Sequence, residues 1–221
     1  MKPEITSEKV KPLLETKFLN VYDLQYEEDK HYFDASRRKK EDLMAIKSKE
    51  EFKVALPDAV TCVVVLKGLS EPLLLLSKEY RYPAGQFLLS PPAGLLDAED
   101  LKLAPNSQDL ALLSAARREI LEETGISIKE GDTLKVINPL LFSTPGMTDE
   151  SNGLVLAVVH LDSLDKLTQD GAVGSECFDG FCLLTKSQAL DILKNGRDMD
   201  ELYYSVYTWA ALMYFVTDMW A

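Results

Sequence analysis

Short runs of β-branched and aliphatic residues alternate along the chain with longer amphipathic segments, a pattern typical of an α/β protein. The clearest strand signal is Ala59–Lys67, where valine recurs within a continuous apolar run, as expected of a buried strand. Leu73–Lys78 and Phe87–Ser90 are also predicted strands. Later strand predictions are Leu134–Asn138, Gly153–Leu161 and Gly180–Leu184. Strands interleaved with helices in this way indicate a mixed sheet with helices on both faces.

Three helices are predicted in the same part of the chain. The longest runs from about Ser107 to Thr124 and is followed by Gly125, because glycine readily adopts the left-handed conformation that ends a helix. Lys186–Asn195 and Glu201–Trp220 form the last two. The final segment is the most apolar of the chain, but polar residues and four tyrosines interrupt it. We therefore expect a helix buried in protein and no membrane span.

The residues before Ala59 follow a different pattern. Two alternating, aromatic-rich segments, Lys17–Gln25 and His31–Arg37, predict an antiparallel hairpin. In Arg37–Lys53, eleven of the seventeen residues are charged and apolar periodicity is weak, which indicates a linker or an exposed connection. We accordingly divide the chain into an N-terminal β annex, residues 1–54, and a main domain, residues 55–221.

Composition and charge narrow the classes of function. The formal net charge of −12 argues against non-specific DNA or RNA binding, which needs a basic surface. It is compatible with a nucleotide substrate, since bound cations neutralise phosphates locally. The charged N-terminus has no apolar core of a signal peptide, and the three cysteines form no CxxC pair. We expect a cytoplasmic protein with reduced thiols.

Three glutamates near the end of the long predicted helix are the strongest chemical signal. At about 100° per residue, Glu119, Glu122 and Glu123 share one arc of the helix surface. Like charges four residues apart repel, and acids near a helix C-terminus oppose the helix dipole. One interpretation is a solvated acidic face in an acidic protein. The other is a site for Mg²⁺, which prefers oxygen ligands and bridges carboxylates to substrate phosphates.

The residues around these glutamates favour the metal. Residues 115–126, Ala-Ala-Arg-Arg-Glu-Ile-Leu-Glu-Glu-Thr-Gly-Ile, resemble the second half of the Nudix box, Gly-x5-Glu-x7-Arg-Glu-U-x-Glu-Glu-x-Gly-U, where U is aliphatic. Pro92-Ala93-Gly94 supplies the opening glycine after a strand. This resemblance implies a Nudix α/β/α sandwich with a small N-terminal antiparallel β annex.

Other segments are similar to the ADP-ribose pyrophosphatase group of this family. Ser77–Gly94 resembles the approach to the box, and Tyr32–Arg37 resembles an N-terminal strand whose aromatic residue and arginine serve the nucleotide. Ser143–Gly146 resembles a Pro-Gly loop, and Gly174–Glu176 resembles the loop that carries a late catalytic glutamate. The resemblance covers residues 32–193.

The resemblance assigns a metal-binding role to four residues. It implies that Glu119 and Glu123 bind Mg²⁺, or Mn²⁺ as an alternative, and that Glu122 is an auxiliary or water-mediated ligand. The backbone carbonyl of Ala93 would complete the metal shell. Arg118 would orient the carboxylates through charge-assisted hydrogen bonds.

The remaining candidates would serve proton transfer and substrate binding. Glu176 is the candidate general base and Glu150 its rival, each with an ordinary surface acid as the alternative. Arg81, and Arg37 from the annex, would contact phosphate or ribose, because the arginine donors form a rigid fork suited to such oxygens. Tyr32 would stack on adenine, although a tyrosine in an alternating strand also serves packing.

The sequence departs from the family pattern in three places. Between Gly94 and Arg118 lie 23 residues where the pattern has 13, and the excess falls around Glu99–Gln108, which we expect to be a surface loop. Leu110 occupies the position of the early glutamate of the box. Ser90 stands where relatives often carry a glutamate near the metals, which leaves the number of bound metals open.

These features together imply a hydrolase of a nucleoside diphosphate linked to a second group. ADP-ribose, split into AMP and ribose 5-phosphate, is the substrate that the resemblance favours. Another nucleotide sugar is an alternative, and so is a regulator that binds such a ligand without cleaving it. The resemblance also implies a homodimer, in which the annex reaches into the partner subunit's site.

Overall fold

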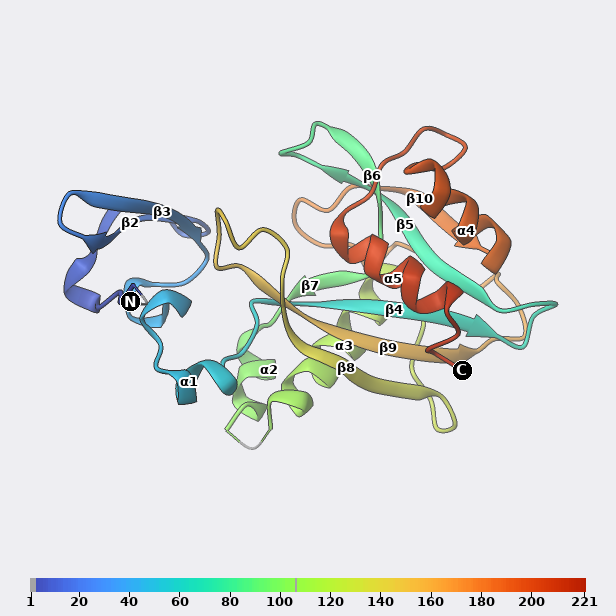
Figure 1. Cartoon of the computed structure of the whole chain (residues 1–221). Helices are drawn as coiled ribbons and strands as arrows, with labels where there is room; N and C mark the ends of the chain where they lie inside the picture. Colours follow the sequence, from blue (N-terminus) through green and yellow to red (C-terminus); the bar gives the residue numbers. More distant parts are fainter. Residues whose placement is uncertain (1–2, 106) are drawn as a thin grey trace. The chain divides into compact units, whose positions relative to one another are not determined.

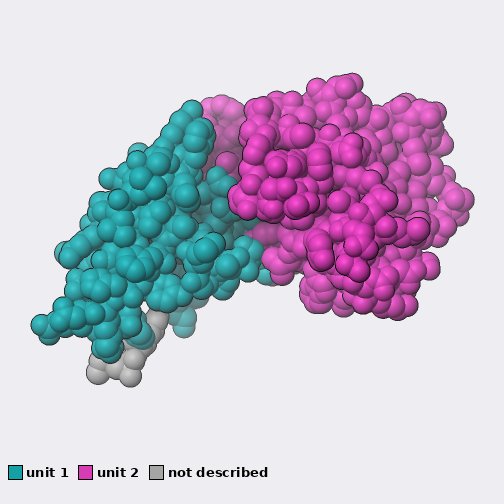
Figure 2. All heavy atoms as spheres, turned by 90° about the horizontal axis from the view of Figure 1, so that it is seen from above, with its two compact units in different colours: residues 1–58, 140–152 teal, residues 59–139, 153–221 magenta. Residues whose placement is uncertain are grey.

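The computed structural model describes residues 3–105 and 107–221, and the chain divides into two compact units. Unit 1 comprises Met1–Asp58 and Leu140–Asn152, and unit 2 comprises Ala59–Pro139 and Gly153–Ala221 (Figure 2). The chain therefore enters unit 1 twice, the second time through the segment between the two longest strands of the protein.

Unit 1 is built on a three-stranded antiparallel sheet, in the order β1-β2-β3. The predicted hairpin is confirmed as β2 (Asn20–Glu27) and β3 (Lys30–Ser36), whereas β1 (Val10–Glu15) was not predicted. Three short helical turns follow the sheet: η2 (Lys40–Asp42), η3 (Met44–Ile46) and α1 (Lys49–Lys53). A 3-10 turn, η1 (Ser7–Lys9), precedes β1.

The charged segment after the hairpin is more than an exposed connection, and that prediction is wrong in part. Leu43 is fully buried and belongs to the core of unit 1 with Val10, Tyr22 and Leu24. Arg38 is also largely buried. Only Leu43 and the adjacent Met44 are buried apolar residues in this charged segment, so apolar periodicity does not reveal that it is anchored.

Unit 2 contains most of a seven-stranded sheet in the order β10-β5-β4-β9-β8, with β6 paired to β5 and β7 paired to β4. The six strand predictions are confirmed, with longer bounds in most cases, whereas the short strand Ala93–Leu95 was not predicted. The strands are β4 (Ala59–Lys67), β5 (Leu73–Arg81), β6 (Gln86–Ser90), β7 (Ala93–Leu95), β8 (Thr133–Phe142), β9 (Ser151–His160) and β10 (Phe178–Leu184).

Helices cover both faces of this sheet, as the sequence predicts (Figure 1). On one face, Val60, Cys62 and Val64 of β4 pack with Ala116 and Ile120 of α3 (Gln108–Thr124). Side chains alternate along a strand, so the intervening residues of β4 point to the other face, where they are buried as well. That face is covered by α4 (Lys186–Asn195) and α5 (Val206–Val216). The α/β sandwich is thus confirmed.

The helix ends follow local sequence signals. Ser107 caps α3 by accepting a hydrogen bond from the N–H of Leu110, and Gly125 ends it with a positive φ of 73°. The last predicted helix is shorter than expected, because α5 begins only after its capping residue, Ser205. In the part of the chain that the structure describes, no helix has the length and apolarity needed to cross a membrane.

Candidate functional site

The last two turns of α3 carry the three glutamates that the sequence singles out. Glu119 and Glu123 are each only 4% exposed, whereas the side chain of Glu122 is one-third exposed. A solvated acidic face therefore does not describe Glu119 and Glu123. Two carboxylates buried side by side are costly unless cations or hydrogen bonds compensate them.

Burial changes the protonation of these acids. Burial raises the pKa of Glu123 to about 9, an effect opposed by a hydrogen bond from the N–H of Ala93 and reinforced by the charge of Glu79. The pKa of Glu119 is also raised by burial, although Arg118 opposes the shift. Such groups gain most from a cation, since a nearby positive charge favours the ionised form.

Strand β7 lies directly against these carboxylates. The Ala93 N–H donates to Oε1 of Glu123 at 3.3 Å. A Cβ atom at Gly94 would overlap the carboxylate of Glu119, so any larger residue would force this carboxylate out of its observed position. The opening glycine of the motif thus admits a buried carboxylate beside the backbone.

Arg118 connects the glutamates to the rest of the fold. Its Nη1 donates to Oε1 of Glu119 at 2.5 Å and to Oε2 of Glu122 at 3.3 Å, and its Nη2 donates to the carbonyl of Leu95 at 2.9 Å. Burial alone would lower the pKa of Arg118, but hydrogen bonds and charges from Asp100 and Glu119 raise it above its ordinary value. Arg118 therefore stays protonated and can orient two carboxylates.

The insertion before α3 contributes to this arrangement, which corrects the expectation of a surface loop. Residues 98–103 form a short helix, α2 (Ala98–Leu103), capped by Asp97; Asn106 lies outside the described residues. Asp100 of this helix is 3% exposed and accepts from Nη2 of Arg118 at 3.1 Å. Sequence reasoning missed Asp100, although two acids three residues apart are a helix-capping signal.

The donor set suits a hard divalent cation. Within the described residues, no three acidic, histidine or cysteine side chains converge as a preformed metal cluster. Arg118 and the Ala93 N–H contact Glu119 and Glu123 instead. However, the residues offer only oxygen ligands, the type that Mg²⁺ prefers.

Glu176 and Arg81 belong to the same unit as these glutamates. Glu176 is half-buried in the loop before β10, and its carboxylate accepts from the N–H of Val173 at 2.8 Å. Its charge raises the pKa of both Glu119 and Glu123, which places it within electrostatic reach of them. Arg81 forms an ion pair of 2.6 Å with Glu79, a buried residue that sequence reasoning missed.

The other three candidates lie in unit 1. Arg37 donates to Glu150 at 2.8 Å, so these two candidates are partners of each other. The hydroxyl of Tyr32 donates to the carbonyl of Gly146 at 2.7 Å. A residue that sequence reasoning missed is Arg38, which is largely buried and forms an ion pair of 2.8 Å with Asp58.

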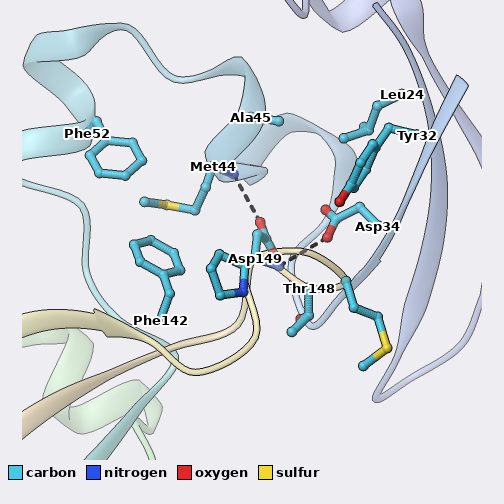
Figure 3. A pocket seen from close by; sticks show the side chains of 11 residues that line it. Leu24, Tyr32, Asp34, Met44, Ala45, Phe52, Phe142, Thr148 and Asp149 are labelled. Atoms are coloured by element: carbon cyan, nitrogen blue, oxygen red, sulfur yellow. Dashed lines mark hydrogen bonds between the residues drawn. The ribbon is translucent and has the colours of Figure 1, made fainter. Parts of the chain in front are cut away.

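Unit 1 also encloses a cavity of about 290 Å³, which Figure 3 shows from close by. Its walls are mostly apolar and include Met44, Phe52 and Phe142. Tyr32 and the buried Asp34 line it as well, and Oδ2 of Asp34 has no hydrogen-bond partner among the described residues. Oδ1 of Asp149, another lining residue, also has no hydrogen-bond partner there, although it lies 3.4 Å from Arg38. A largely apolar cavity with such carboxylate oxygens suits a flat ring that carries an N–H donor.

Comparisons with known proteins agree with the motif. A family model described as NUDIX domain matches residues 55–204. The chain is 34% identical over 110 residues to the Caenorhabditis elegans protein named "Putative nudix hydrolase 2", covering 49% of this chain and 43% of that protein. It is 29% identical over 104 residues to an uncharacterized Nudix hydrolase of Schizosaccharomyces pombe, covering 47% and 44%. The matches thus span less than half of each relative's own length.

We predict that Gly94→Ala destabilises the protein by about 1–3 kcal/mol, because the added methyl group overlaps the Glu119 carboxylate. Gly94 has no positive φ, so alanine adds no backbone strain. Urea denaturation of Gly94→Ala, Glu119→Ala and the double variant measures the coupling. Most of the loss should disappear in the Glu119→Ala background; an unchanged loss there would refute the close approach.

We expect Asp100→Asn to lower the free energy of unfolding by about 1–3 kcal/mol, because it removes the buried charge that pairs with Arg118. Asp109→Asn is the matched control, since Asp109 is exposed in the first turn of α3. Its effect should stay within about 0.5 kcal/mol. Equal stability of the two variants in urea denaturation would show that α2 is dispensable for the site.

Asp34 should make the stability of unit 1 depend on pH. Burial, reinforced by the charge of Asp149, raises the pKa of Asp34 to about 6, so the folded form holds a proton that the unfolded form releases. Its contribution is present below the unfolded pKa of 3.8 and is lost as the pH rises through about 6. The size of this contribution is at most about 3 kcal/mol.

Asp34→Asn should therefore stabilise the protein at pH 7.5 and have less effect at pH 4.5. Urea denaturation at both pH values tests this, with Asp42→Asn, an exposed position in η2, as the control. The same stability difference at the two pH values would contradict the prediction.

Proposed function

Because the chain belongs to the NUDIX domain family, we propose that it hydrolyses the diphosphate bond of a nucleoside diphosphate joined to a second group, with ADP-ribose as the substrate. The observation that carries this proposal is the pair of buried glutamates, Glu119 and Glu123, beside Gly94 and Arg118. A stable fold gains little from burying two acids on one helix, whereas phosphoryl transfer needs such an arrangement.

Mg²⁺, or Mn²⁺ in its place, would be held by Glu119 and Glu123, with Glu122 as an auxiliary ligand and the carbonyl of Ala93 completing the set. When bound, the metal supplies charge stabilisation and polarises the phosphoryl oxygens. Arg118 keeps two of the glutamates oriented, and it is itself anchored on α2 and β7.

Glu176 is the general base of this proposal. It accepts a proton from the attacking water while the water oxygen forms a bond to one phosphorus and the bridging P–O bond breaks. The products are AMP and ribose 5-phosphate. Glu150 remains the second candidate, and its ion pair with Arg37 means that it must first release that partner.

The lining of the unit 1 cavity is an argument for an adenine nucleotide as the substrate. Its apolar walls suit a base, Tyr32 offers an aromatic surface, and the unpaired oxygen of Asp34 can accept a hydrogen bond from an exocyclic amine. Arg37 and Arg81 are the proposed contacts to phosphate or ribose, since the arginine fork matches such oxygens.

The direct test is turnover of a substrate panel with Mg²⁺. We expect ADP-ribose to be cleaved faster than other nucleotide sugars, with AMP as a product detected by chromatography. Glu119→Gln should lower the rate by about two or more orders of magnitude while the fold remains. Glu130→Gln, at an exposed position, is the matched control and should retain activity. Tight binding of ADP-ribose without turnover would instead support the regulator.

Glu176→Gln distinguishes the base from a metal ligand. We expect kcat to fall by about 10²–10⁴, the range of a lost general base, with little change in Mg²⁺ affinity. If the rate is unchanged, Glu150→Gln is the next variant, and loss of activity there would transfer the role to the unit 1 residue.

We also propose that the protein is a homodimer assembled through unit 1. Single exposed apolar residues are ordinary on a protein surface, but a concentration of them marks an interaction site. Large exposed apolar side chains of unit 1 are Leu13, Leu14, Phe18, Leu19, Tyr32, Phe33, Phe52, Val54 and Met147. A second copy of this chain would cover such residues.

Light scattering should then give a mass near twice 24.7 kDa. The double variant Leu13→Asp/Phe18→Asp should dissociate at concentrations where the native chain is dimeric, because it places charges among the exposed apolar residues. Val173→Asp, at an exposed position of unit 2, should not change the mass. A native monomer would rule out the dimer.

A further inference from the structure

One buried acid of unit 2 has no role in the mechanism above. The side chain of Glu79 on β5 is only 13% exposed, yet it carries a carboxylate. A charged group at such a depth is costly unless a cation or hydrogen bonds compensate it. The carboxylate of Glu79 therefore needs a cation nearby to compensate its charge.

The register of the sheet places Glu79 on the same face as α3. Leu75 of β5 packs in the core cluster that contains α3, and side chains alternate along the strand, so Glu79 and Arg81 point to that face as well. Strand β6 pairs with β5 so that Ser77 lies opposite Ser90. Ser90 and Glu79 are thus diagonal neighbours on the α3 face of the sheet.

The contacts of Glu79 agree with this placement. Its carboxylate pairs with Arg81 at 2.6 Å, and the hydroxyl of Ser90 interacts with it. Burial raises the pKa of Glu79, while Arg81 and then Ser90 lower it. Ser90 is itself buried, and a neutral hydroxyl cannot balance the charges of the neighbouring acids.

Glu79 is also on the part of β5 that lies near the end of α3. The N–H of Thr168 donates to the carbonyl of Thr124 at 3.1 Å, and the adjacent Gln169 donates to the hydroxyl of Ser77 at 3.2 Å, two residues before Glu79 on the same face. Arg118 contacts Glu119 and Glu122, and Arg81 contacts Glu79. Glu123 receives a backbone N–H from Ala93. A divalent cation on the Glu79–Glu123 side of the site would therefore offset charge that Arg118 does not contact.

We propose that Glu79 is an additional carboxylate ligand of the divalent metal held by Glu119 and Glu123, supplied from β5 because the adjacent position on β6 carries only the hydroxyl of Ser90. This inference rests on the proposed function, since it assumes the metal. Ser90 positions Glu79, whereas the positive charge of Arg81 competes with the metal for its carboxylate. The alternative is that Glu79 serves only to hold Arg81.

Metal binding without substrate tests this inference separately from catalysis. The measurements are Mn²⁺ affinity by electron paramagnetic resonance of the free ion and the shift in Tm on adding Mn²⁺. We expect Glu79→Gln to weaken Mn²⁺ binding at least about tenfold, the size of effect seen when a metal shell is disturbed. Glu130→Gln is the exposed control, and Arg81→Gln should leave Mn²⁺ affinity unchanged or raise it.

The register between β5 and β6 also suggests a second variant that should restore Mn²⁺ binding. Because positions 79 and 90 are diagonal neighbours on one face, Glu79→Gln/Ser90→Glu returns one carboxylate to the same region and should recover most of the Mn²⁺ affinity. Circular dichroism verifies that each variant folds. If the double variant does not fold, Glu79→Asp replaces it, and partial retention of affinity is expected from its shorter carboxylate.

The outcomes are distinct. If the native protein does not bind Mn²⁺, the proposed function fails together with this inference. If the native protein and Glu79→Gln bind Mn²⁺ equally well, Glu79 is not a ligand, and the proposed function stands. If Arg81→Gln weakens binding as much as Glu79→Gln does, Glu79 acts through Arg81 and the inference is overturned.

Discussion

The close approach of α3 to the sheet is the constraint on which unit 2 depends. At two places a side chain of the helix lies against a glycine of a strand: Leu112 against Gly153 of β9, and Glu119 against Gly94 of β7. A Cβ atom at either glycine would overlap the helical side chain. The first contact is apolar and belongs to the core, whereas the second brings a carboxylate into it. The same packing thus fixes both the fold and the position of the charged site.

Burying carboxylates in this way sets the requirements on their neighbours. Arg118 offsets part of the charge, but one guanidinium faces Glu119, Glu122 and Asp100 together. Glu79 and Glu123 add two further acids on this side of the sheet, and burial raises the pKa of each. Such an excess of buried acid costs stability in a protein that has no other use for it. The arrangement is consistent with a site that is completed by a metal ion and phosphates.

The sequence predicts those parts of the fold whose signals are local. Ala59–Lys67 and Lys186–Asn195 coincide with β4 and α4, because a continuous apolar run and a capped amphipathic segment need no distant information. Strand β1 has no such signal: only Val10 is buried, and its pairing with β2 shifts register between Pro12 and Leu14. β1 is a strand because it forms hydrogen bonds with β2. The alternation of polar and apolar residues in the sequence cannot reveal such pairing.

The same distinction applies to the candidate site. Glu119 and Glu123 follow from helical spacing, whereas Asp100 depends on where an inserted helix meets Arg118, and Glu79 depends on the register between β5 and β6. Unit 1 gives a parallel case, because Arg37 and Arg38 are adjacent in the sequence and differ in environment. Arg38 is enclosed by Asp58 and Asp149, and Arg37 is more exposed and paired with Glu150. Counting charges in a segment cannot separate a buried ion network from a solvated one. The partners that decide between them come from residues 58 and 149–151, far along the chain.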